Sequence, residues 1–120
     1  MYNKSYKVPT QVKNVNNIGL LIGVGSVGKK HAKTMSEIFD VLYVVDVDHN
    51  ALDWCKDNLK CSLKTFSNLE QAIYENNELQ NTVCLIANWG IGHFDVLIKL
   101  IQNGAKSFYD YDWKFLAGPF

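Results

Sequence analysis

The chain has 120 residues, of which 48% are hydrophobic, and its twelve basic and twelve acidic residues leave no net charge. This length suits a single domain with a core of ordinary size. Without a block of like charge, no nucleic-acid or membrane-surface partner is expected. No apolar stretch reaches the roughly 20 residues that span a bilayer, and the first residues are too polar for a signal peptide. The three cysteines, Cys55, Cys61 and Cys84, lack metal-ligand spacing and suit reduced thiols. These features predict a cytoplasmic protein without a metal site.

The first 17 residues differ in composition from the segment that follows them. Residues 1–17 are polar and rich in asparagine, with Pro9 among them, and we interpret them as an N-terminal arm. Ile18–Ile22 is apolar throughout, which is typical of a parallel strand covered by helices on both faces. The folded domain is therefore expected to cover residues 18–120.

A glycine-rich turn follows this strand and leads into a helical pattern at residues 29–39. Its sequence is Gly23-Val24-Gly25-Ser26-Val27-Gly28. A strand, a glycine turn and a helix in this order are typical of dinucleotide sites. Gly23 would allow the tight turn, Gly25 would let the backbone approach a pyrophosphate, and Gly28 would let the helix pack closely on the strand. The pyrophosphate would bind at the helix N-terminus, where free N–H groups and the helix dipole favour negative charge.

The helix after the turn and the next strand extend this pattern. The helix is expected to bury the residues that recur at helical spacing, which are Val27, His31, Met35 and Ile38. The next apolar run, Val41–Val45, ends in Asp46, which lies 18 residues beyond Gly28. At this distance a carboxylate accepts hydrogen bonds from the adenosine ribose. A glycine loop without a ligand is disfavoured, because the turn, the helix and the acid occur in the expected order.

Strand-like and helix-like segments alternate along the rest of the chain. In order they are a helix capped by Asp48 or Asn50, a strand at residues 63–66, a helix capped by Ser67 or Asn68, a strand at 82–87, an apolar helix at 91–102 that Asn103 and Gly104 end, and a strand that begins at 107–109. The alternation predicts an α/β fold, a Rossmann-type doubly wound parallel sheet of strand order 3-2-1-4-5 in three α/β/α layers. Ligands of such sheets bind at the carboxyl ends of the strands beside the switch point, where the glycine turn and residues 88–93 are expected to meet.

Together these segments resemble the N-terminal cofactor domain of the glucose–fructose oxidoreductase and inositol dehydrogenase family over residues 18–109. The matching residues are Gly23-x-Gly25-x-x-Gly28-Lys29-Lys30-His31-Ala32, Asp46-Val47-Asp48, Ala87-Asn88-Trp89-x-x-x-His93 and Gly104-Ala105-Lys106. In the family, the third segment lies along the nicotinamide half of the cofactor. The resemblance implies that the cofactor is bound by Gly23, Gly25, Ser26, Val27, Gly28, Asp46, Ala87, Asn88, Trp89 and His93. His93 has the alternative role of packing or capping at the start of its helix.

Three features depart from the family pattern. The family has Glu-Lys-Pro after its fifth strand, where the lysine helps to hold substrate and cofactor, whereas this chain has Tyr111-Asp112-Trp113. Asn88-Trp89 replaces the usual Thr-Pro, and the family's C-terminal substrate domain is not among these 120 residues. We therefore assign no catalytic residue. The resemblance implies hydride transfer between the hydroxyl or carbonyl carbon of a sugar or cyclitol and nicotinamide, and the chain alone is not expected to complete it.

Asp46 predicts NAD rather than NADP as the cofactor, because a carboxylate accepts from ribose hydroxyls and repels a 2′-phosphate, and no arginine follows it. A methyltransferase that binds S-adenosylmethionine is an alternative. It is disfavoured because those enzymes usually carry an acid before the glycines, where this chain has Leu20-Leu21-Ile22. A ligand-free interaction module is a further alternative, which the intact glycines disfavour. The apolar tail, residues 113–120, either folds back on the domain or forms a homo-oligomer interface.

Overall fold

The computed structural model describes residues 17–87, 92–110 and 115–117. Its sheet has five parallel strands in the order β3-β2-β1-β4-β5, and a sixth strand pairs antiparallel with β5 at the edge. The strands are β1 (Ile18–Ile22), β2 (Val41–Val45), β3 (Ser62–Phe66), β4 (Val83–Ile86), β5 (Ser107–Asp110) and β6 (Phe115–Ala117). The predicted Rossmann-like sheet and its strand order are confirmed, whereas β6 was not expected.

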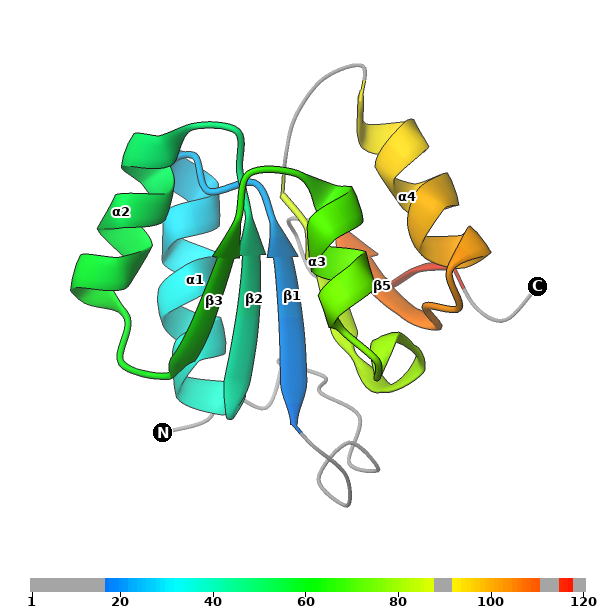
Figure 1. The fold of residues 1–120 in the computed structure, drawn as a ribbon, viewed down its shortest axis with the longest axis horizontal. Coiled ribbons are helices and arrows are strands. Elements are labelled where there is room, and N and C mark those ends of the chain that lie inside the picture. The colour runs from blue at the N-terminus through cyan, green and yellow to red at the C-terminus, as the bar shows by residue number, and fades with distance from the viewer. Residues whose placement is uncertain (1–16, 88–91, 111–114, 118–120) are drawn as a thin grey trace.

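Helices cover both faces of this sheet and complete three layers (Figure 1). They are α1 (Ser26–Ile38), α2 (His49–Asn58), α3 (Leu69–Glu75) and α4 (Gly92–Gln102), and a short 3-10 helix, η2 (Leu79–Asn81), precedes β4. Leu21 of β1 packs in the core beneath α1 and α2, whereas its neighbour Leu20 packs in the core beneath α3 and α4. Because right-handed crossovers lead outward from β1 in both directions, the first two helices and the last two lie on opposite faces.

Local side-chain contacts fix the helix ends that the sequence predicted. The carboxylate of Asp48 accepts a hydrogen bond from the N–H of Asn50 (2.9 Å), and the amide oxygen of Asn68 accepts one from the N–H of Gln71 (2.8 Å). Gly104 follows α4 with a φ of 96°, the left-handed conformation that commonly ends helices. The predicted caps at Asp48 and Asn68 and the stop at Gly104 are therefore confirmed.

The buried face of α1 differs from the predicted one. Met35 is fully buried as expected, but the other buried residues of α1 are Gly28 and Ala32. The remaining residues of the predicted face, Val27, His31 and Ile38, are half-buried. Small residues at the centre of the contact let the helix approach the sheet closely, and a pattern built on large apolar side chains does not detect them.

Asn17, which the sequence placed at the end of the arm, belongs to the fold. Its carbonyl oxygen accepts hydrogen bonds from the N–H groups of Asp40 (2.9 Å) and Val41 (3.2 Å), and its side chain donates to the carbonyl of Ile38 (2.6 Å). These contacts tie the start of β1 to the turn between α1 and β2. Asn17, the last residue of the predicted arm, is therefore bonded to the fold, and the rest of the arm lies outside the described residues.

The three cysteines are free thiols within the fold. Cys55 and Cys84 are buried and Cys61 is half-buried. Burial raises the pKa of Cys84 to about 12, so this thiol stays protonated near neutral pH. In the part of the chain that the structure describes, no helix has the length and apolarity needed to cross a membrane.

Candidate functional site

The glycine turn lies at the carboxyl end of the sheet, between β1 and α1. Gly23 has a φ of 97°, a conformation that side chains disfavour. Its N–H donates a hydrogen bond to the carbonyl oxygen of Val45, the last residue of β2 (2.8 Å). The turn is therefore held against the end of the neighbouring strand, and the tight turn predicted at Gly23 is confirmed.

Gly28 lies where α1 packs against this turn. A Cβ built at Gly28 would lie 2.2 Å from the carbonyl oxygen of Gly23, far closer than real side chains approach, and 3.9 Å from the Cβ of Ala87. The close contact between helix and turn therefore requires glycine at this position. This agrees with the packing role that the sequence predicted.

Gly25 lies in a different environment from Gly28. It is exposed, its φ of −77° is open to any residue, and a Cβ built on it would meet no heavy atom within 4 Å. Neither the backbone conformation nor the packing of the chain requires glycine here. The missing side chain leaves open space beside the start of α1, which is the space that a pyrophosphate at this turn would need.

The N-terminus of α1 is open to a negatively charged group. No side chain caps the helix, and its first turn contains no acidic residue. The first N–H groups of a helix have no acceptor within it, and here they belong to Ser26, Val27 and Gly28. Ser26 is exposed and Val27 is half-buried. The donors and the helix dipole therefore favour an anion at this end.

Asp46 connects the glycine turn with the loop after β2. One carboxylate oxygen, Oδ2, accepts a hydrogen bond from the N–H of Val24 (2.7 Å), and Oδ1 accepts one from the N–H of Asp48 (2.8 Å). Because a carboxylate has about four lone pairs, each oxygen retains capacity for a further donor such as a ribose hydroxyl. The structure thus brings together the turn and the acid that the sequence predicted to act as one site.

The titratable groups around Asp46 include the thiol of Cys55 and the ammonium group of Lys29. Burial, and then the charge of Asp46, raise the pKa of Cys55 to about 11, while Lys29 acts in the opposite direction. Cys55 is therefore protonated near neutral pH and adds no second negative charge. The ammonium group of Lys29 lies over the ring of Trp54, 5.5 Å from its centroid. This cation–π contact joins α1 to α2, so Lys29 contributes to the fold.

The segment after β4 begins beside the turn. Ala87 is buried, and its N–H donates a hydrogen bond to the carbonyl oxygen of Ile22 (2.8 Å), so the chain leaves β4 next to the end of β1. Asn88 and Trp89 lie outside the described residues. His93 belongs to the first turn of α4, and its side chain also lies outside the described part. The contact of these three residues with nicotinamide stays a prediction.

The sequence did not predict the backbone contacts that two residues make at the site. Val24 and Asp48 hold the carboxylate of Asp46 through their backbone N–H groups. A side-chain pattern contains no information on backbone donors. However, an acid followed two residues later by a helix cap is compatible with an Asx turn, in which a side chain accepts from the N–H two residues on.

The two glycines provide a matched pair for a stability test. Gly28→Ala is expected to lower the free energy of unfolding by about 1–3 kcal/mol, because the new Cβ meets the carbonyl of Gly23 and forces α1 away from the turn. Gly25→Ala adds the same methyl group in open space at the N-cap of α1 and should lower stability by less, at most about 1 kcal/mol. Urea unfolding followed by circular dichroism measures both, and equal stabilities of the two variants would contradict the close contact at Gly28.

Comparisons with protein-family models, curated proteins and solved structures gave no significant match to this chain. The resemblance to the glucose–fructose oxidoreductase and inositol dehydrogenase family therefore depends on the motif residues alone.

Proposed function

We propose that the chain is a dinucleotide-binding domain that holds NAD between the glycine turn and Asp46. The observation that carries this proposal is the contrast between Gly25 and Gly28. Packing requires Gly28, whereas Gly25 is exposed, has an ordinary φ and has room for a side chain. A ligand that approaches the backbone closely explains why glycine is present at a position where the fold does not need it.

In this proposal, the two ends of the site bind different parts of the cofactor. The N–H groups at the start of α1, from Ser26 to Gly28, bind the pyrophosphate. Asp46 binds the hydroxyls of the adenosine ribose, and its bonds from Val24 and Asp48 orient the carboxylate before the cofactor arrives. Val47 is 83% exposed and offers an apolar surface next to Asp46 for the adenine ring.

The charge of the site supports NAD over NADP. A 2′-phosphate would lie where Asp46 receives the ribose, and the two negative groups would repel each other. All twelve basic residues of the chain are lysines. No guanidinium group is therefore present in this sequence to form the bidentate contact with which arginine often holds a phosphate.

The family resemblance extends the proposal to an oxidoreductase. Bound NAD would supply a hydride acceptor, and the resemblance makes the carbon that bears a hydroxyl of a sugar or cyclitol the hydride donor. The residues of this chain bind and orient the cofactor. Tyr111-Asp112-Trp113, at the position of the family's Glu-Lys-Pro, lies outside the described residues.

Isothermal calorimetry is expected to show tighter binding of NAD than of NADP or S-adenosylmethionine. Asp46→Asn should weaken NAD binding by about 10- to 100-fold, because a hydrogen bond to a charged group contributes about 1.5–3 kcal/mol. It should also narrow the difference between NAD and NADP, because a neutral amide does not repel the 2′-phosphate.

Asp48→Asn is the matched control for Asp46→Asn. It removes a carboxylate two residues away and keeps the side-chain oxygen that caps α2, so the preference for NAD should persist. If the wild-type chain binds NADP as tightly as NAD, Asp46 does not have the role proposed here.

Gly25→Val is expected to abolish NAD binding without unfolding the chain. The valine side chain would fill the space assigned to the pyrophosphate, while the φ of Gly25 and the lack of contacts around its Cβ allow the substitution. Circular dichroism checks the fold and calorimetry the binding. A folded Gly25→Val chain that binds NAD like the wild type would show that the cofactor binds elsewhere.

The chain loaded with NAD is expected to show no sustained turnover with a panel of polyols and sugars. The reason is that Asp112 stands where the family has the lysine that helps to hold the substrate. Absorbance of the reduced nicotinamide measures the reaction. Turnover that disappears in the Gly25→Val variant would contradict this expectation and would make His93 and Lys114 the candidates for catalysis.

A further inference from the structure

Helix α4 has apolar residues on its outward side as well as on the side that the domain buries. Of the side chains described between residues 94 and 102, only that of Leu100 is buried. Phe94 and Ile98 are 65% and 37% exposed. An amphipathic helix of a globular domain normally turns its apolar side to the core. One face of α4 therefore lacks a partner within the described part of the chain.

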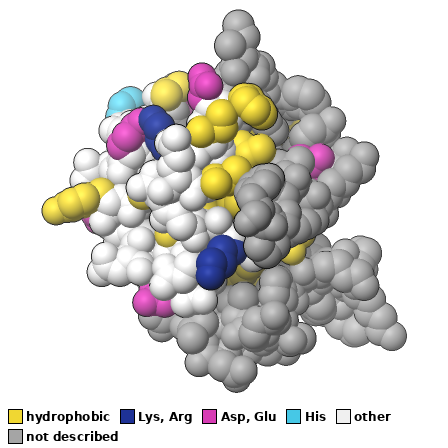
Figure 2. Space-filling model, turned by 90° about the vertical axis from the view of Figure 1, so that its right-hand side faces the viewer, with side chains coloured by type: hydrophobic (Ala, Val, Ile, Leu, Met, Phe, Trp, Pro, Cys, Tyr) yellow, Lys and Arg dark blue, Asp and Glu magenta, His cyan; other side chains and the backbone are white. Residues whose placement is uncertain are grey.

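Three apolar residues of α4 form a stripe. At 100° per residue, the exposed Phe94 and Ile98 and the half-buried Ile101, which packs against the core, fall within about 60° of one another around the helix axis. Tyr74 of α3 is 82% exposed and lines a shallow groove with Lys99 of α4. Figure 2 views the molecule from the side that carries α4, and hydrophobic side chains gather on this face. Hydrophobic side chains therefore gather along α4, and the groove that Tyr74 and Lys99 line lies beside them.

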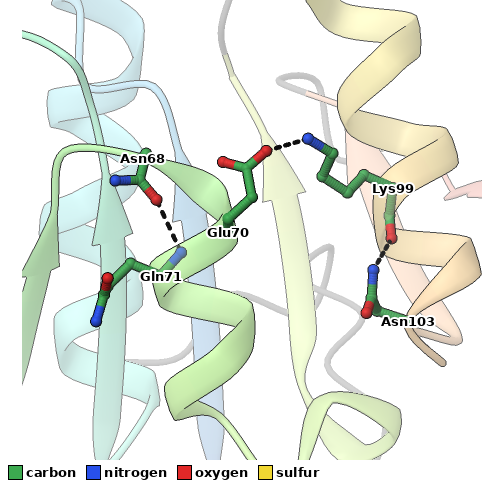
Figure 3. A network of polar contacts seen from close by, with 5 residues as sticks. All are labelled: Asn68, Glu70, Gln71, Lys99 and Asn103. Carbon is green, nitrogen blue, oxygen red and sulfur yellow. Dashed lines mark hydrogen bonds and ion pairs between the residues drawn. The ribbon is translucent and has the colours of Figure 1, made fainter.

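Opposite charges lie along one side of this stripe. Asp95 and Lys99 are four residues apart and so occupy the same side of α4. The ammonium group of Lys99 contacts the carboxylate of Glu70 in α3, which lowers the pKa of Glu70 (Figure 3). The carbonyl oxygen of Lys99 accepts a hydrogen bond from the side chain of Asn103 (2.8 Å). Lys99 is thus held beside the stripe, with Asp95 one turn before it.

We propose that this surface is a homodimer interface in which α4 packs antiparallel against α4 of a second copy about a two-fold axis. Such an axis reverses the partner helix and places the same flank of both helices face to face. Asp95 of each copy then lies opposite Lys99 of the other copy, and the two apolar stripes meet beside these two charge pairs. The order of charges along the flank is its own complement, which favours a second copy over a partner of one dominant charge.

Two further properties of the chain agree with a second copy as the partner of α4. Twelve basic and twelve acidic residues leave no net charge, so two copies do not repel each other as a whole. Helix α4 also lies on the opposite face of the sheet from α1. The dimer therefore leaves the start of α1 accessible, and the proposed interface does not depend on the proposed cofactor.

The test uses two variants of the full chain whose charges are changed on the same flank. In a homodimer, Asp95→Lys places two positive charges opposite each other. Lys99→Asp places two negative charges opposite each other. Sedimentation equilibrium over a range of concentrations should show that the wild type dimerises and that each variant does so at least about tenfold more weakly. An equimolar mixture of the two variants should restore the dimer, because both interfacial charge pairs are then attractive.

The mixture separates an interface from effects within one chain, because each variant keeps its own substitution when mixed. Asp57→Lys makes the same charge change at an exposed residue of α2, on the other face of the sheet, and should leave dimerisation unchanged. Phe94→Ser should weaken the dimer without adding charge. Circular dichroism checks the fold of each chain. A monomeric wild type, a mixture of folded variants that stays monomeric, or an equal effect of Asp57→Lys would each overturn the proposal.

Discussion

The hydrogen bond between the N–H of Val24 and the carboxylate of Asp46 joins parts of the chain that are 22 residues apart. One residue earlier, the N–H of Gly23 donates to the carbonyl of Val45, so two consecutive donors hold the turn on the end of β2. These bonds require parallel strands in which Ile22 lies beside Val45. The position of the glycine turn then sets where α1 begins and which way the N-terminus of α1 points.

Asp46 has a role in the fold, and this role bears on why an acid is present at this position. Its two oxygens accept from two different backbone N–H groups, and an asparagine has only one acceptor oxygen in its side chain. A carboxylate is therefore useful at this position even without a ligand. Gly28 is likewise explained by packing. Gly25 has no close contact that requires glycine, so Gly25 supports a cofactor more than the acid does.

Much of the fold was predictable because its determinants are local. Apolar runs mark the central strands, Asp48 and Asn68 cap their helices through neighbouring residues, and crossover handedness yields the strand order. The missed features are those that depend on distant contacts. Asn17 is tied to the fold by bonds to residues 38–41, and the inner face of α1 centres on two small residues. At the site, Gly23, Gly28 and Asp46 were predicted from side-chain type, whereas the backbone donors Val24 and Asp48 were not.

The apolar helix at residues 91–102 illustrates a further limit of sequence patterns. Core and interface residues are both apolar, so its composition predicts burial without naming what buries it. In the structure, Leu100 contacts the core while Phe94 lies in solvent. Because right-handed crossovers place α1 and α4 on opposite faces of the sheet, the two surfaces share no helix. A substitution such as Phe94→Ser on α4 is therefore expected to leave the glycine turn unchanged, and Gly25→Val is expected to leave α4 unchanged.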